Sequence, residues 1–271
     1  MLIALIDNVR FEAKKGLHGI CPGCSQPVIA KCGKIKIHHW AHRSRGSCAC
    51  WWEPETEWHR SWKKYFPVEW QEIYMKDVQN NEKHIADIKT PQGFVIEFQH
   101  SYINEEKRVS REKFYQNMVW VVNGARTDTD YFRFFLGKDY RLQKTIHTGI
   151  FHINSPNESF SRLWTESPMT VFFDFLGTHQ LNRNEPDRNL LWCLFPDRMD
   201  GAAVVAALKR EDFVNIVKTN SQLLLSAKIF IDYLINIQKM QIEAQKAEAE
   251  AKRVLEQRSR SKYRIYKRRI F

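Results

Sequence analysis

The sequence lacks a long apolar run. Its longest one, LLLSAKIFIDYLINI, is interrupted by Lys228 and Asp232 and is shorter than the roughly 20 residues that a helix needs to cross a bilayer, so we expect no membrane partner. The opening MLIALIDNVRF has neither a basic segment nor a cleavage site, which argues against a secretory signal peptide. We therefore expect a cytoplasmic protein.

Cysteine is also scarce, with six residues in a chain of 271. In a reducing compartment these thiols stay unpaired, so a metal site is a better expectation than a disulfide framework. The composition is not that of a disordered chain, because 43% of the residues are hydrophobic and 13% are aromatic. The chain is long enough for one large domain or two smaller ones.

Acidic residues are fewer than basic ones, 31 against 42, which gives a formal net charge of +11. The excess lies mostly in residues 252–271, where a single acid accompanies a block of bases. These bases are Lys252, Arg253, Arg258, Arg260, Lys262, Arg264, Lys267, Arg268 and Arg269. Such a block is typical of a nucleic-acid-binding tail or of a solvated one. The charge favours a polyanionic partner, and a basic protein without such a partner is the alternative.

The order of apolar patterns predicts an α/β fold in four parts. Residues 1–50 are rich in Cys, His and Gly and are interpreted as a small metal-binding module. Residues 51–125 read as a helix (PETEWHRSWKKYF), three strands (WQEIYMKDV, HIADIKT, FVIEFQH), a helix that begins after Asn104, and a buried strand (VWVVNG). That order indicates a compact α/β unit.

The second half of the chain is less informative. Residues 126–220 are interpreted as an α/β extension or a small second domain, with strands expected in YFRFFL, TVFFDFL and NLLWCLF and a helix in part of GAAVVAALKREDFVNIV. Residues 221–271 are rich in helix formers and alternating charges, which predicts a helical arm with a basic tail. The arm offers a surface for a protein partner or for self-association.

A metal-ligand pattern occurs in the first part. CPGC supplies Cys21 and Cys24, and IHHWAH supplies His38, His39 and His42. Two thiolates and two imidazoles satisfy tetrahedral Zn²⁺, and a structural zinc would explain how so small a segment folds. The spacing permits either His38 or His39 with His42, and free cysteines with surface histidines are the alternative. Further candidate ligands are Cys32, Cys48 and Cys50.

Two acids interrupt the most strand-like segment, HIADIKTPQGFVIEFQHS. Residues two apart in a strand share a face, so Glu97 and Gln99 lie together, and pairing through the TPQG turn brings Asp87 close to Glu97. Adjacent carboxylates repel each other unless a cation lies between them. Mg²⁺ prefers oxygen ligands and activates water for attack on a phosphodiester. The alternative is a solvated strand face, since exposed faces of antiparallel sheets are normally polar.

Charged residues on the neighbouring helices add to this interpretation. Glu55, His59 and Lys63 are spaced i, i+4, i+8 and lie on one helical face that would lean over the hairpin, unless they form an ordinary charged stripe. Arg108 and Arg111 follow the hairpin on the next helix and are candidates, with Lys63, for contacts to phosphates. Solvated helix bases are the alternative for the arginines.

Taken together, these motifs resemble the competence protein CoiA-like family, well over residues 1–124 and faintly over 125–215. The resemblance implies a zinc-finger-like N-terminus followed by a PD-(D/E)XK nuclease core, which is a restriction-endonuclease-like mixed sheet flanked by helices. The family's His-aromatic-x-His pattern matches His39, Trp40, Ala41 and His42, and it therefore favours His39 over His38 as a zinc ligand.

The resemblance also implies an activity: a metal-dependent DNA endonuclease or DNA-processing nuclease, with catalytic Mg²⁺ or Mn²⁺, in competence, recombination or defence against foreign DNA. RNA is not distinguished from DNA as the partner. The family's catalytic positions correspond to Glu55, His59, Asp87, Glu97 and Gln99.

One position departs from the family, because its usual lysine is Gln99 here. A neutral amide orients water but does not stabilise negative charge as well as an ammonium group does. Lys63 and Lys89 are the candidates for the missing charge. The rival hypothesis is a non-catalytic, zinc-containing DNA-binding or scaffold subunit of a larger complex.

Overall fold

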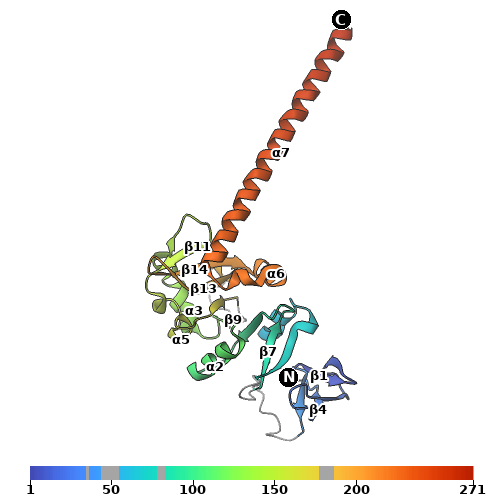
Figure 1. The fold of residues 1–271 in the computed structure, drawn as a ribbon, viewed down its shortest axis with the longest axis vertical. Coiled ribbons are helices and arrows are strands. Elements are labelled where there is room, and N and C mark those ends of the chain that lie inside the picture. Colours follow the sequence, from blue (N-terminus) through green and yellow to red (C-terminus); the bar gives the residue numbers. More distant parts are fainter. Residues whose placement is uncertain (35–36, 44–54, 78–82, 177–185, 271) are drawn as a thin grey trace. The chain divides into compact units, whose positions relative to one another are not determined.

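The computed structural model describes residues 1–34, 37–43, 55–77, 83–176 and 186–270. The chain divides into two units, Met1–Ala227 and Lys228–Phe271. The first unit contains two β-sheets and the helices that pack on them, and the second is one continuous helix (Figure 1).

The smaller sheet has five antiparallel strands in the order β2-β1-β3-β4-β5. Its strands are β1 (Ile3–Ile6), β2 (Val9–Glu12), β3 (His18–Ile20), β4 (Pro27–Lys31) and β5 (His39–His42). Asp7 and Asn8 join β1 to β2 with φ of 50° and 63°, the left-handed pair that a tight hairpin turn requires. The hydrophobic core beneath this sheet is small and consists of Met1, Ala4, Ala13, Cys21, Val28 and Trp40.

The larger sheet has nine strands in the order β10-β11-β14-β13-β12-β9-β8-β7-β6. It is mixed, because the β8–β9 and β9–β12 pairs are parallel and the others are antiparallel. The strands are β6 (Gln71–Lys76), β7 (Lys83–Lys89), β8 (Val95–Gln99), β9 (Met118–Asn123), β10 (Gln143–Lys144), β11 (Ile150–Ile153), β12 (Thr170–Asp174), β13 (Leu190–Met199) and β14 (Ala202–Lys209). The expected α/β class, with a mixed sheet and flanking helices, is confirmed.

Helices and 3-10 turns connect these strands. They are α1 (Glu57–Lys63), η1 (Val68–Trp70), α2 (Glu105–Tyr115), α3 (Asp128–Phe135), α4 (Lys138–Arg141), η2 (Pro156–Glu158), α5 (Arg162–Thr165), η3 (Pro186–Asn189), α6 (Arg210–Asn220), η4 (Ser221–Leu224) and α7 (Ala227–Ile270). The order α1-β6-β7-β8-α2-β9 is the predicted helix, three strands, helix and strand. α2 begins after Asn104, whose side chain accepts a hydrogen bond from the backbone N–H of Lys107.

One segment of the second half differs from the prediction, and a second is helical only in part, as expected. YFRFFL is not a strand but lies mostly in α3. Thr127 caps the N-terminus of this helix, and Tyr131, Phe134 and Phe135 recur at the helical spacing and are buried together. The helix expected in part of GAAVVAALKREDFVNIV is α6, which begins at Arg210, and the apolar run AAVVAALK before it is strand β14. In both cases a short apolar run is compatible with a helix and with a strand, and tertiary packing determines which of the two forms.

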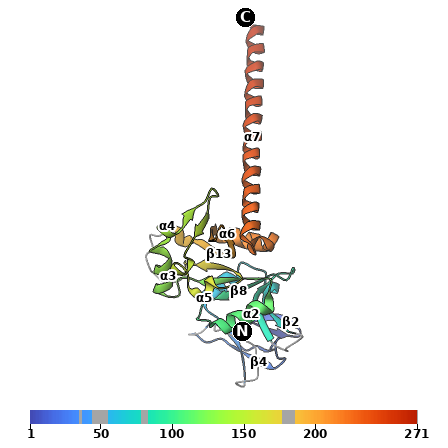
Figure 2. The same cartoon turned by 60° about the vertical axis from the view of Figure 1, so that its left-hand side comes forward.

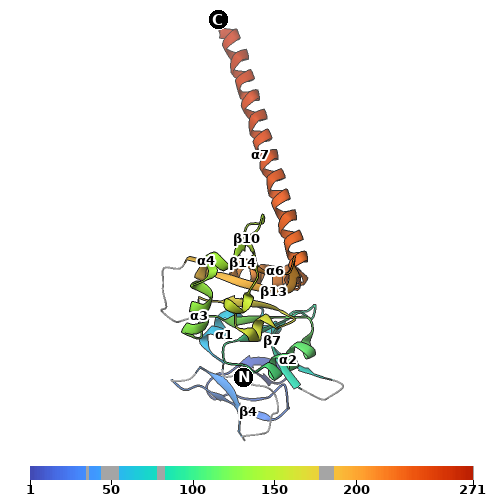
Figure 3. The same ribbon diagram turned by 90° about the vertical axis from the view of Figure 1, so that its left-hand side faces the viewer.

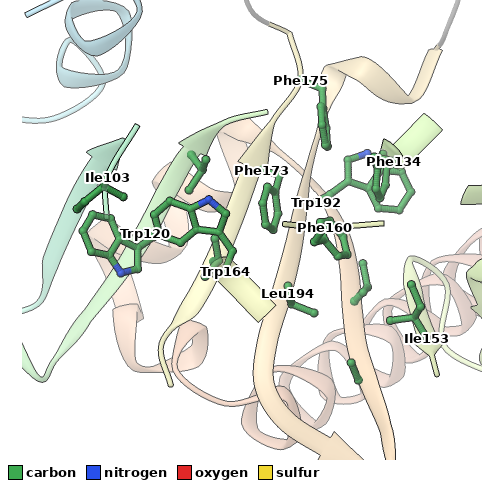
Figure 4. Close-up of a cluster of buried hydrophobic side chains, with 14 of the residues drawn as sticks. Ile103, Trp120, Phe134, Ile153, Phe160, Trp164, Phe173, Phe175, Trp192 and Leu194 are labelled. Carbon is green, nitrogen blue, oxygen red and sulfur yellow. The ribbon is translucent and has the colours of Figure 1, made fainter. Parts of the chain in front are cut away.

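Both faces of the larger sheet are covered. On one face, residues of α2, α3 and α5 pack with β9, β12, β13 and β14 in an aromatic core whose largest members include Trp120, Phe134, Trp164 and Trp192 (Figure 4). On the other face, Trp62 of α1 stacks on Phe98 of β8 with ring centroids 5.7 Å apart and meets Phe213 of α6 edge-on. The sheet is therefore the middle layer of three.

The smaller sheet lies beside the end of the larger sheet that carries β7 and α2 (Figure 2, Figure 3). Two side chains join them directly. The Glu72 carboxylate at the start of β6 accepts hydrogen bonds from the backbone N–H groups of Leu2, at 3.0 and 2.8 Å, and of Ile3, at 3.0 Å, and the Arg10 guanidinium of β2 donates to the Gln71 carbonyl of β6. Among the described residues no helix is both long enough and apolar enough to cross a membrane.

Candidate metal centre and active site

Three potential zinc ligands converge in the N-terminal sheet. Cys21 and Cys24 follow β3, and His42 ends β5; their ligand atoms all lie within 4.8 Å of one another. The Cys24 Sγ is 3.1 Å from the His42 Nε2, and the backbone N–H of Gly23 donates to the Cys21 Sγ at 3.4 Å. Burial lowers the pKa of His42, which favours the neutral imidazole that binds a metal. The donor types and their spacing fit zinc.

The structure does not bring His39 to this cluster. In β5, His39 pairs with Lys31 while His42 pairs with Val28, and an odd separation along a strand puts the two imidazoles on opposite faces. His39 Nδ1 is instead 2.7 Å from the carbonyl oxygen of Ile37. The other candidates do not join the described cluster: His38 is exposed, Cys32 Sγ donates to the Ala13 carbonyl at 3.7 Å, and Cys48 and Cys50 lie outside the described residues.

A second polar cluster lines a cavity of about 60 Å³ between the two sheets. It gathers side chains from the segment before α1, from α1 itself, from β6, β7 and β8, and from α2. The ionisable ones are Glu55, His59, Lys63, Glu72, Asp87, Glu97 and Arg111. Six of these seven are residues that the sequence singled out, and the exception is Glu72.

Asp87 and Glu97 lie side by side because the β7–β8 ladder opens between them. The backbone pairing runs through Ile88 with Ile96 and Lys89 with Val95. At the next position carboxylate oxygens replace the backbone carbonyls as acceptors. The Asp87 backbone N–H donates to the Glu97 Oε1 at 3.4 Å, and the Phe98 N–H donates to the Asp87 Oδ2 at 2.9 Å. Both carboxylates therefore face the same cavity.

Lys63 lies among three carboxylates. Its Nζ is 3.0 Å from the Asp87 Oδ1, 3.2 Å from the Glu72 Oε1 and 3.4 Å from the Glu55 Oε1. The residue is only 4% exposed, so water does little to screen these contacts. Burial by itself lowers the pKa of Lys63, but the three carboxylates together raise it above the usual lysine value. The group is therefore a permanent cation in the cavity rather than a surface base.

Glu72 was missed by the sequence reasoning. Gln71 pairs with Ile88 and Ile73 with Ala86, so the register places Glu72 across from Asp87. Its φ of 47° is unusual for a residue with a side chain, and strain of this kind is often found at functional sites. The signal in the sequence was its place in the strand WQEIYMKDV, but its position across from Asp87 depends on the register of β6 with β7, which the local pattern does not determine.

The acids of the cavity differ in charge state. Burial raises the pKa of Glu97 to about 8, although Arg111 Nη1, 2.9 Å from the Glu97 Oε2, lowers it in part. Burial likewise raises the pKa of Glu55 to about 6. Burial also acts on Asp87, but there the Lys63 ammonium prevails and holds its pKa below the usual range. Near neutral pH and without a metal ion, the site thus holds an ionised Asp87 beside a Glu97 that is mostly protonated.

His59 ties α1 to the site. Its Nδ1 accepts a hydrogen bond from the Thr56 backbone N–H at 3.3 Å, so the proton is on Nε2, which donates to the Phe98 carbonyl at 3.0 Å. The same helix is held at the sheet by Asp174, whose Oδ2 accepts from the indole N–H groups of Trp58 and Trp62, each at 2.9 Å. These contacts fix the position of α1 on the sheet and therefore the point at which the Lys63 side chain enters the cavity.

Gln99 and Arg108 are not in this cluster. The Gln99 Nε2 donates to the Ser101 carbonyl at 2.9 Å, and the residue lines a second cavity together with residues of β9, α3 and α5. Arg108 is 2% exposed and forms an ion pair with Glu112 in the core. Of the three predicted phosphate contacts, Lys63 and Arg111 therefore lie in the acidic cavity and Arg108 does not.

Residues 8–50 match the family model of the N-terminal domain of competence protein CoiA. The matched segment contains Cys21, Cys24 and His42. No curated protein and no solved structure matches the chain. The similarity thus covers the module with the metal-ligand cluster. Any interpretation of the acidic cavity rests on the geometry of its residues.

Proposed function

We propose that the protein is a metal-dependent DNA nuclease of the PD-(D/E)XK type with a competence-related role. The observation that carries the proposal is the pair of carboxylates Asp87 and Glu97, held on one side of an opened β7–β8 ladder and facing the same cavity. The family match at residues 8–50 supports the competence-related role.

The topology supports this assignment. The unit α1-β6-β7-β8-α2-β9 has an antiparallel β6-β7-β8 meander followed by a parallel β9, with one acid on the second strand and the other on the third. This is the arrangement that a restriction-endonuclease-like core requires. Glu55, just before α1, adds the acid that such nucleases carry at the first helix.

The donor set of the cavity fits a divalent cation, because Asp87, Glu97, Glu55 and Glu72 offer the oxygen ligands that Mg²⁺ and Mn²⁺ prefer. Of these, Asp87 and Glu97 are the proposed ligands. A bound ion would act as a Lewis acid on the phosphate and would lower the pKa of a bound water. The zinc-type cluster of Cys21, Cys24 and His42 would be structural, since it offers thiolates to a module with a small core.

Lys63 supplies the positive charge that Gln99 cannot. Its ammonium is 3.0 Å from the Asp87 Oδ1, so it approaches the proposed site from α1 rather than from β8. A cation at this position stabilises negative charge that develops on the phosphate oxygens. Arg111 orients the Glu97 carboxylate, and His59 acts as a positioning residue because both ring nitrogens hold the helix start against β8.

The test is DNA cleavage in Mg²⁺ by Asp87→Asn and Glu97→Gln, compared with the parent and with Glu69→Gln. Glu69 is an exposed acid in η1, so its variant removes one charge without touching the cavity. We expect cleavage to fall by at least about a hundredfold in the first two variants, because losing a metal ligand removes transition-state stabilisation. Cleavage equal to that of Glu69→Gln would contradict the assignment.

The rival hypothesis is a DNA-binding or scaffold subunit without cleavage. It is favoured by one feature, which is that Lys63 and Arg111 already neutralise much of the acidic charge. On that hypothesis the cluster is a structural ion-pair network, and salt-sensitive DNA binding persists after both acids are removed. A parent protein that binds DNA and cuts none in Mg²⁺ or Mn²⁺ would favour this hypothesis.

A further inference from the structure

A cavity of about 560 Å³ lies on the face of the larger sheet opposite α1 and α6. It is bounded by the C-terminal ends of β8 and β9, by the segment before α2, and by α3 and α5. It shares no lining residue with the acidic cavity. Its size falls in the range of roughly 300–1,000 Å³ that is usual for small-molecule sites.

The floor of this cavity is aromatic. Phe160, Trp164, Phe173 and Phe175 line it, and Figure 4 shows them together on this face of the sheet. Phe160 and Phe173 stack with ring centroids 4.5 Å apart. A planar aromatic ligand would gain stacking contacts here.

Two polar groups on the wall have no partner among the described residues. Ser159 is 2% exposed, and its Oγ forms no hydrogen bond there. A buried hydroxyl left without a partner costs free energy, so it indicates a place for a ligand atom. Arg133, which is partly exposed, forms no ion pair within the described part of the chain, whereas the neighbouring Arg126 and Arg162 pair with Asp130 and Glu166.

We propose that this second cavity binds one nucleotide unit, with the base on the aromatic floor and the phosphate at Arg133. The guanidinium of Arg133, which has no ion-pair partner in the described part of the chain, would bind an anion, and the aromatic floor would bind a flat ring. A nucleotide contains both groups.

The position of the cavity suits a nucleic-acid strand. Glu97 and Gln99 are two residues apart on β8, which is about 7 Å along the strand, and one lines each cavity. Adjacent units of one strand would reach both. The inference goes beyond the proposed cleavage and does not depend on it, because a nucleotide binds this cavity with or without a reaction at the acids.

The experiment is calorimetric titration of the full chain, without divalent metal, with the four deoxynucleoside monophosphates and with a short single-stranded oligonucleotide. Arg133→Gln removes the unpaired charge, and Ser161→Trp fills the cavity from its partly exposed rim. Lys218→Gln is the control, because this exposed base lies on α6 over the other face of the sheet. Since metal is absent, the result is independent of cleavage.

We expect the parent and Lys218→Gln to bind, Arg133→Gln to lose about tenfold or more in affinity, and Ser161→Trp to lose binding. Binding of the monophosphates identifies a free nucleotide as a ligand, and binding of the oligonucleotide alone identifies a strand. The proposal is overturned if neither binds, if the two cavity variants match Lys218→Gln, or if inorganic phosphate competes as well as a nucleotide does.

Discussion

Replacing Lys63 by methionine removes the cation around which the acidic cavity is arranged. Methionine has a similar length and no charge, so the change isolates the ammonium group. In the parent protein this cation is shared by three carboxylates, those of Glu55, Glu72 and Asp87, and in the variant they have no buried cation beside them. Their mutual repulsion then raises their pKa values and destabilises the folded state.

The expected size of the effect follows from the geometry. At an effective dielectric constant of about 20, two unit charges 3.2 Å apart attract each other by about 5 kcal/mol, and Lys63 has contacts at 3.0, 3.2 and 3.4 Å. Burying the ammonium group offsets part of this attraction. Removal of one partner from a buried ion pair typically costs about 3–5 kcal/mol, and we expect Lys63→Met to lose that much free energy of unfolding.

The assay is urea unfolding of Lys63→Met and of Lys64→Met in chelator and then in Mn²⁺. Lys64 is the next residue in the chain and is exposed, so its variant carries the same substitution outside the cavity and should change stability by less than about 0.5 kcal/mol. Mn²⁺ should stabilise Lys63→Met more than the parent, by up to about 2.7 kcal/mol at a hundredfold excess over its dissociation constant, because the ion replaces the missing charge.

Two results would refute this reasoning. One is equal stability of the Lys63 and Lys64 variants in chelator, which would mean that the carboxylates do not depend on the ammonium. The other is equal stabilisation of both variants by Mn²⁺, which would place the ion elsewhere in the protein.

The remaining predictions concern three other groups. Mn²⁺ affinity should rise by up to about tenfold per pH unit from pH 6 to the Glu97 pKa of about 8, because the ion displaces a proton from this carboxyl; a flat pH profile in calorimetry would contradict this. Cys24→Ser should lower the zinc content by elemental analysis and lower the melting temperature, whereas Cys32→Ser should change neither; equal zinc in both would remove Cys24 from the ligand set. Asp174→Asn should cost about 3 kcal/mol in chemical unfolding, because it leaves the Arg210 cation unpaired and weakens the acceptor that holds α1; a change below about 0.5 kcal/mol would show that this contact is dispensable.

The sequence predicted the parts of the site that depend on local pattern. The alternation of HIADIKT and FVIEFQH with a turn between them placed Asp87 beside Glu97, and the four-residue spacing put His59 and Lys63 on the helical face that meets the cavity. Such patterns determine which residues share a face, and they do so before any tertiary contact is known.

Features that depend on tertiary packing could not be predicted from local sequence patterns. Glu72 lies across from Asp87 only through the register of β6 with β7, and the burial of Lys63 depends on the separate elements that meet around the cavity. Gln99 has the same strand parity as Glu97, yet it lies at the C-terminal end of β8 and lines the other cavity, together with residues of β9, α3 and α5. The preference for His39 came from a sequence pattern, and strand β5 turns that imidazole away from His42.

A crystal structure with Mn²⁺, in which anomalous scattering locates the ion, tests most directly whether Asp87 and Glu97 bind a divalent metal. We expect an anomalous peak within coordination distance of a carboxylate oxygen of Asp87 and one of Glu97. A peak elsewhere, or an empty cavity with the Lys63 contacts intact at saturating Mn²⁺, would contradict the account.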